Sequence, residues 1–210
     1  MGIYDFEIEP GVKIKAKLID NPTLVHQNIC ELYSTLKTPV AGLDVKLHSS
    51  FWPWIGNQAQ MLILCVENHC LIIQLAHLDV FPQILKKILA DEKICFVGKE
   101  LGRKLATLPR VGNNNDYNNA VTCNTGVEVG NLAARVLKKP YISELGLAYL
   151  VNEAGVSPSV AGTVFSSSGA SGGSPWIDYS ARAFTEEEIK CVIREAYTCY
   201  AIGNKLLNML

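Results

Sequence analysis

Two patterns of hydrophobic and polar residues open the chain. Between residues 12 and 18, apolar residues occupy every second position and lysines lie between them. Because successive side chains of a strand point to opposite faces, this pattern predicts a half-buried strand with a solvated lysine face. From Asn21 to Leu36 the apolar residues recur at helical spacing, and Asn21 followed by Pro22 is typical of a helix start. A strand followed by a helix is therefore expected.

Residues 40–50 predict a buried strand that carries a carboxylate at its middle. One face of this strand is apolar, whereas the other carries Gly42, Asp44, Lys46 and His48. An aspartate in so apolar a strand is either a surface residue of a one-sided sheet or a ligand held on a rigid element.

Two further apolar runs, 61–66 and 70–75, are separated by few enough residues for a hairpin. With residues 40–50 they predict three antiparallel strands. Both runs are apolar at nearly every position, so we expect both faces of the sheet to be covered.

The second half of the chain predicts strands and helices in alternation. Helical spacing and short apolar runs predict helices over 82–89, 101–108, 131–137 and 145–151 and strands over 94–97 and 120–123. Residues 111–119, which include Asp116, and 166–174 are rich in Asn, Gly and Ser and are interpreted as a loop and an insertion. Thr185 and Glu188 predict a capping box at the start of a helix that runs to about Leu207, which explains the glutamate triplet without a catalytic role.

Composition indicates one globular domain spanning residues 1–210. The chain has 210 residues, 49% of them hydrophobic, which is enough for one sizeable core. The formal net charge of -1 and the absence of a long basic run disfavour a tight, sequence-independent nucleic-acid binder. The sequence offers neither a signal-peptide pattern nor an apolar run of membrane-spanning length. We expect a soluble intracellular protein, in the cytosol or nucleus, with no membrane partner.

The residue types that most often carry chemistry show no recognised spacing. The seven cysteines form no C-x-x-C pair and mostly fall in apolar runs, so buried reduced thiols are expected. None of the four histidines has a spaced partner for zinc or for a nucleophile. The chain also lacks a phosphate-binding G-x-x-x-x-G-K loop and a G-x-S-x-G elbow.

An ordered series of segments nevertheless resembles the DEDD superfamily of 3'-5' exonucleases, in particular its plant Werner-syndrome-like branch. The resemblance extends over about residues 12–208 and implies a ribonuclease H-like α/β fold, with a mixed sheet of an antiparallel meander plus parallel strands, flanked by helices. The segments that carry it are 40–50, 61–66, 70–75, 94–98, 125–133, 174–176 and 185–197.

In that family four acidic residues hold two divalent metal ions, which activate the attacking water and stabilise the leaving oxygen. Carried over to this chain, the first acid is Asp44, and the second is replaced by Lys46. The third should fall near residues 99–105, which contain no aspartate. The fourth is retained as Glu195, and the family tyrosine four residues before it is replaced by Cys191. The resemblance therefore implies a degenerate site with Asp44 and Glu195 as its remaining catalytic acids.

Lys46 is the decisive substitution. Our hypothesis is that its ammonium pairs with Asp44 and Glu195, taking the place of the metal charge without generating hydroxide. The alternative is that Lys46 extends to solvent.

The resemblance implies an exonuclease-like protein with weak or no nuclease activity that retains nucleic-acid binding, to DNA or RNA, or an assembly role. One alternative is an active exonuclease with Mg²⁺ or Mn²⁺ at Asp44, assisted by Glu195 and Glu100; otherwise no cofactor is expected. The other is a structural or regulatory homo-oligomer with no nucleic-acid role.

Overall fold

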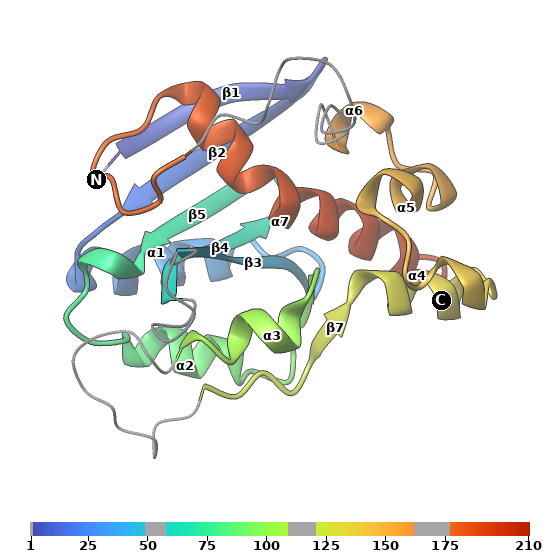
Figure 1. The fold of residues 1–210 in the computed structure, drawn as a ribbon, viewed down its shortest axis with the longest axis horizontal. Helices are drawn as coiled ribbons and strands as arrows, with labels where there is room; N and C mark the ends of the chain where they lie inside the picture. The colour runs from blue at the N-terminus through green and yellow to red at the C-terminus, as the bar shows by residue number, and fades with distance from the viewer. Residues whose placement is uncertain (1, 49–57, 109–120, 162–176) are drawn as a thin grey trace.

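A computed structural model describes residues 2–48, 58–108, 121–161 and 177–210 of the chain. Its centre is one seven-stranded sheet with the strand order β1-β2-β5-β4-β3-β6-β7 (Figure 1). The strands are β1 (Gly2–Glu9), β2 (Val12–Ile19), β3 (Val40–His48), β4 (Gln58–Val66), β5 (His69–Gln74), β6 (Cys95–Gly98) and β7 (Gly126–Glu128).

The sheet is mixed, as the sequence predicts. β3, β4 and β5 form an antiparallel meander, with Asp44 opposite Ile63 and Cys65 opposite Cys70. β6 and β7 extend this meander on one side as parallel strands, and β2 joins β5 in parallel on the other. β1 pairs antiparallel with β2. The predicted α/β class with a meander and parallel strands is confirmed.

Helices cover both faces of the sheet (Figure 1). One apolar core lies between the sheet and α7, with α4 to α6 beside it, and the other lies under α1, α2 and α3. The predicted double coverage is therefore confirmed. The α-helices are α1 (Pro22–Ser34), α2 (Gln83–Leu89), α3 (Leu101–Leu105), α4 (Val129–Val136), α5 (Leu147–Glu153), α6 (Pro158–Ala161) and α7 (Glu186–Leu207), and the 3-10 turns are η1 (Leu75–His77) and η3 (Pro140–Ile142).

The starts of α1 and α7 follow from their sequences. The side chain of Asn21 accepts the backbone N–H groups of Thr23 and Leu24 at the start of α1. At the start of α7, the Thr185 hydroxyl accepts the N–H of Glu188, whose carboxylate accepts the N–H of Thr185 in return. Both predicted caps are present, and α7 ends at the predicted Leu207.

A glycine brings α7 close to the strand that carries Asp44. A Cβ atom added at Gly42 of β3 would lie 2.0 Å from the carbonyl oxygen of Ala196 in α7. Only glycine permits this approach, because real Cβ atoms do not come so near a backbone oxygen. The helix is thereby held against β3 at Gly42, which lies two residues before Asp44 on the same face of the strand.

Some predicted elements were wrong or incomplete. Strand β1 was not predicted, although Tyr4, Phe6 and Ile8 alternate with acidic residues. Of the predicted strand 120–123, the described residues 121–123 do not pair with the sheet. The strand that does pair is Gly126–Glu128, because the N–H of Gly126 first closes a turn by donating to the carbonyl of Cys123. Helix α3 ends at Leu105, earlier than predicted. The segments 111–119 and 166–174 lie outside the described residues.

The structure also bears on the cysteines and on membrane-spanning helices. All seven cysteines are free thiols, and Cys65, Cys70 and Cys199 are buried, whereas Cys30 is exposed. Among the helices within the described ranges, none combines the length and the apolar character needed to cross a bilayer.

Candidate functional site

Asp44 lies at the middle of β3 and is almost completely buried, with 1% of its surface exposed. Leu43 and Val45 point to the core under α1 to α3, so the alternation of the strand turns Asp44 toward α7. The surface alternative for Asp44 is therefore wrong. A buried carboxylate requires charged or hydrogen-bonding partners, because burial without them is costly.

Two lysines supply those partners. Lys104 of α3 donates hydrogen bonds to Asp44 Oδ1 and to Glu195 Oε1, both at 2.6 Å. Lys46 Nζ lies 2.6 Å from Asp44 Oδ2 and 3.8 Å from Glu195 Oε2. The expected pairing of Lys46 with both acids is thus present. We call these four residues, Asp44, Lys46, Lys104 and Glu195, the lysine–carboxylate quartet.

Sequence reasoning missed Lys104, although a signal for it exists. Leu101, Lys104, Leu105 and Leu108 recur at helical spacing, so a lysine occupies one position of an otherwise apolar helix stripe. Lysine is rarely buried unless it is paired. A lysine in that stripe therefore indicates a carboxylate nearby.

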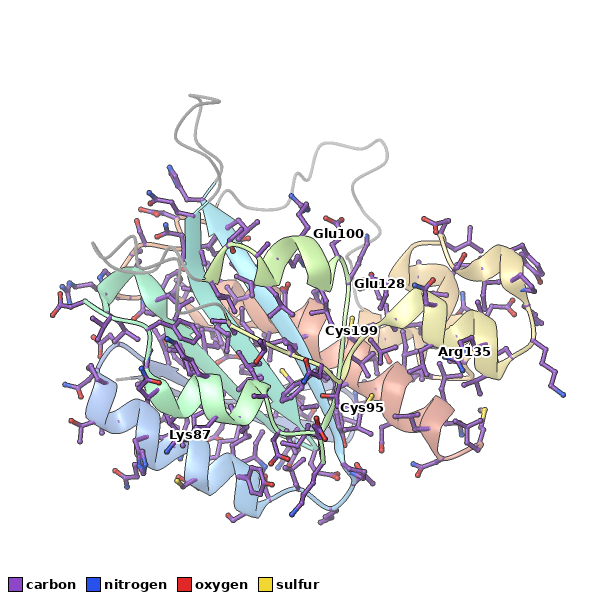
Figure 2. All side chains as sticks on the ribbon, turned by 90° about the horizontal axis from the view of Figure 1, so that it is seen from below. Lys87, Cys95, Glu100, Glu128, Arg135 and Cys199 are labelled. Atoms are coloured by element: carbon purple, nitrogen blue, oxygen red, sulfur yellow. The ribbon has the colours of Figure 1, made fainter. Side chains whose placement is uncertain are left out.

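A carboxylate from a distant strand fixes the start of α3. Glu128, at the end of β7, accepts the N–H of Glu100 at 2.7 Å and the N–H of Leu101 at 3.1 Å. Figure 2 shows Glu100 and Glu128 side by side at this junction. Glu100 itself has a left-handed backbone with φ of 55°. These contacts set the direction of α3 and so carry Lys104 to Asp44.

Glu100 and Cys191 have no place among the charges of the quartet. The side chain of Glu100 accepts a hydrogen bond from Arg103 at 2.8 Å and is 47% exposed. The idea that Glu100 shares a metal with Asp44 and Glu195 therefore receives no support from the geometry. Cys191 lies one turn before Glu195 on α7 and is partly buried.

Charge pairing outweighs burial at the quartet. Burial alone would raise the pKa of Asp44, but the ammonium groups of Lys46 and Lys104 lower this pKa below its usual value. Burial likewise opposes the charge on each lysine, yet Asp44 and Glu195 raise the pKa of Lys46 and of Lys104. Asp44, Lys46 and Lys104 therefore carry charge at neutral pH, and each ammonium group contacts Glu195 as well.

This arrangement does not fit the divalent metal ions that the family resemblance implies. Mg²⁺ and Mn²⁺ need several oxygen ligands with free lone pairs, and an ammonium nitrogen offers none. Both oxygens of Asp44 already contact ammonium groups. Across the ranges 2–48, 58–108, 121–161 and 177–210, no three side chains of His, Cys, Asp or Glu are grouped so as to hold a metal ion.

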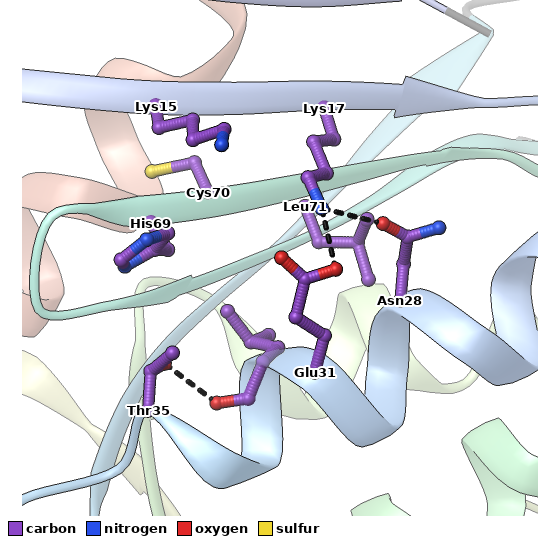
Figure 3. Close-up of a pocket in the computed structure, with 9 residues that line it drawn as sticks. Lys15, Lys17, Asn28, Glu31, Thr35, His69, Cys70 and Leu71 are labelled. Carbon is purple, nitrogen blue, oxygen red and sulfur yellow. Dashed lines mark hydrogen bonds and ion pairs between the residues drawn. The ribbon is translucent and has the colours of Figure 1, made fainter.

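Among the residues that the structure describes, two hollows are lined without any residue of the quartet. The first is a cavity of about 20 Å³ between β2, β5 and α1, where Lys17 contacts Asn28 at 2.9 Å and Glu31 at 2.6 Å (Figure 3). It has room for about one water molecule. The second is an open groove of about 790 Å³ near the carboxyl ends of α1 and α7. In the first hollow, Lys17 pairs with Asn28 and Glu31 of α1, whereas the sequence predicts that this lysine is solvated.

Comparison with known proteins supports the fold. No family model matches the chain, and neither does any curated protein. Solved structures do match. The catalytic core of RRP6 from Trypanosoma brucei aligns with 94% of this chain at a TM-score of 0.64 and 11% identity. Escherichia coli RNase D, an exoribonuclease involved in structured RNA processing, aligns with 92% at 0.63 and 16% identity.

Brucella melitensis NrnC aligns with 93% of this chain and 79% of its own, with a TM-score of 0.59 and 13% identity. The chain spans only 49% of the RRP6 structure and 44% of RNase D. At such low identities the likeness concerns the fold and not the activity. The chain therefore has the ribonuclease H-like α/β fold that the sequence resemblance implies.

Proposed function

We propose that this chain is an exonuclease-like domain of the DEDD superfamily, of the Werner-like branch, which binds nucleic acid without hydrolysing it. The fold shared with RNase D and the RRP6 catalytic core supports the superfamily. The order of sequence segments supports the branch. The lysine–carboxylate quartet supports the loss of hydrolysis.

The single observation that carries this proposal is the replacement of metal charge by ammonium charge around Asp44. Each lysine contacts both Asp44 and Glu195, so each occupies a position between two acids. A divalent ion in such a position lowers the pKa of a bound water molecule. An ammonium group supplies the positive charge but binds no hydroxide, so the attacking nucleophile is lost.

The first test is digestion of a 3'-labelled single strand and a recessed duplex in Mg²⁺ and in Mn²⁺. The parent protein is expected to give no metal-dependent product. Metal-dependent product that disappears in Asp44→Ala would establish the active exonuclease instead. If the protein neither digests the strands nor binds them in a salt-dependent way, and forms an oligomer whose size depends on concentration, a structural homo-oligomer would be favoured.

The second test concerns the two lysines together. Lys46→Glu alone should not restore Mn²⁺ binding, because Lys104 still contacts both Asp44 and Glu195. The double variant Lys46→Glu/Lys104→Asp presents four carboxylates and is expected to bind Mn²⁺, measured by titration calorimetry. Tight Mn²⁺ binding by the parent protein would contradict the proposal.

A further inference from the structure

The residues that the structure describes do not use all the N–H donors of the two ammonium groups of the quartet. A lysine ammonium carries three N–H donors. Lys104 uses two of them on Asp44 and Glu195. Lys46 makes one contact of hydrogen-bond length, to Asp44, since its 3.8 Å distance to Glu195 is too long. Among the described residues, none accepts the one donor that remains on Lys104 or the two on Lys46.

The quartet is open to solvent on one side. The side chain of Glu195 is 29% exposed and that of Lys46 13%, whereas Asp44 is 1% exposed. The site therefore has a closed end at Asp44 and an open end at Glu195, which both lysines contact. A ligand that reached the open end would meet donors from two lysines.

The unused N–H donors of the two lysines favour an anion with several acceptor oxygens. Without the lysines, Asp44 and Glu195 would repel a phosphate group. With them the formal charges of the four side chains sum to zero, and both ammonium groups contact the partly exposed Glu195. A phosphodiester has one negative charge and two non-bridging oxygens, which match donors on two ammonium groups.

We propose that Lys46 and Lys104 bind a phosphodiester of a single-stranded nucleic acid directly, without any metal ion. This inference rests on the proposed function, because it places the retained nucleic-acid binding at the quartet. The bound strand stays intact, since neither ammonium supplies a nucleophile. Binding by this chain should consequently be insensitive to chelators.

The test is fluorescence anisotropy of a short 5'-fluorescein-labelled single strand, in a DNA arm and an RNA arm. Titrations are run in EDTA and in Mg²⁺ over a series of salt concentrations. We expect the same affinity with and without Mg²⁺ and a fall of affinity with salt. Binding of either strand supports the proposal, and the stronger arm identifies the nucleic acid.

A gain of affinity separates this site from a general charge effect. Glu195→Gln removes one negative charge from the open end but keeps an oxygen that can accept from Lys104. The anion is then no longer repelled by this carboxylate, so affinity should rise roughly tenfold. Glu153→Gln is the matched control, because Glu153 also pairs with a lysine, Lys139, at 2.5 Å and is 20% exposed. The control should leave affinity unchanged. An unfolded variant cannot produce the gain.

Three results would overturn the inference: binding that EDTA abolishes, an equal effect of Glu195→Gln and Glu153→Gln, or no binding at all. Its failure differs from that of the proposed loss of hydrolysis. Binding without cleavage that Glu195→Gln and Glu153→Gln change equally leaves the proposed function standing and removes the phosphate site, whereas absent binding removes both. Metal-dependent cleavage of the strand removes both.

Discussion

Lys104 shows how a buried charge can be indispensable without adding net stability. Replacing a whole buried ion network by apolar residues is often neutral, because the charges lose hydration on folding. Removing one member is different, since its partners then lie buried without compensation. At the quartet, loss of Lys104 leaves Asp44 with Lys46 as its remaining cation.

We therefore expect Lys104→Met to lower the free energy of unfolding by about 3 kcal/mol, as measured by urea denaturation. Lys87→Met is the control, because Lys87 is exposed on α2 (Figure 2), and it should change stability by less than about 0.5 kcal/mol. Equal effects of the two substitutions would show that Lys104 is solvated and that the quartet does not form.

The sequence predicted some residues of the quartet and not others, for a physical reason. Asp44 and Lys46 lie two residues apart on one strand, so the period of a strand alone places them on the same face. Glu195 followed from the family motif. Lys104 reaches Asp44 across a separation of 60 residues, through a short helix whose direction depends on Glu128. No local pattern records that dependence.

At the scale of elements, α3 is a short helix held by a contact from outside itself. Helices of so few residues are not stable on their own. The Glu128 carboxylate accepts two N–H groups at its start, which are otherwise unsatisfied. The stability of α3 is thus tied to the position of β7.

We expect Glu128→Ala to speed amide hydrogen exchange at Glu100 and Leu101, because their N–H groups lose their acceptor. Exchange in α7 should stay as in the parent protein. The exposed Glu92, replaced by alanine, serves as the control. Unchanged exchange in α3 would mean that Glu128 does not hold this helix.

The packing of α7 on β3 leads to a second prediction, which concerns the free energy of unfolding. Gly42→Ala forces its Cβ against the Ala196 carbonyl and should cost about 2 to 3 kcal/mol of unfolding free energy. Gly102→Ala is the contrasting control. Gly102 lies within α3, and a Cβ atom added there meets no atom within 4 Å. It should stabilise by about 0.5 to 1 kcal/mol. Similar thermal shifts for both would contradict the close approach of α7.

Element predictions failed where pairing partners, rather than local pattern, decide the structure. Strand β7 has three residues, and its place is set by parallel pairing with β6, in which Val97 lies opposite Val127. A short strand carries too little periodicity to be recognised. Long elements with caps, such as α7, were predicted correctly because their own residues determine both ends.

For the whole molecule, the quartet links stability to pH. The pKa of Asp44 is lowered in the folded state, so its contribution is present above the unfolded value of about 3.9 and is lost as the pH falls through the folded value. The lysine pKa values are raised, so their contribution is present below about 10.4 and is lost as the pH rises through their folded values. Stability should be highest between these limits.

Asp44→Asn isolates the acid side of this dependence. Its free energy of unfolding should start lower than that of the parent protein at neutral pH and decline less steeply below about pH 4. Urea denaturation at a series of pH values measures both slopes. Parallel acid slopes would show that Asp44 is not charged in the folded protein.

Helix α7 covers one face of the sheet, and every other helix and strand that the structure describes precedes it in the chain. A ribosome therefore produces all seven strands before the helix that shields them. Until α7 is complete, Ile63 and Cys65 would face water, and Lys46 and Lys104 would lack Glu195, the second carboxylate of the quartet. The nascent chain thus passes through a stage with an uncovered apolar face, which favours contact with chaperones or with a second nascent chain.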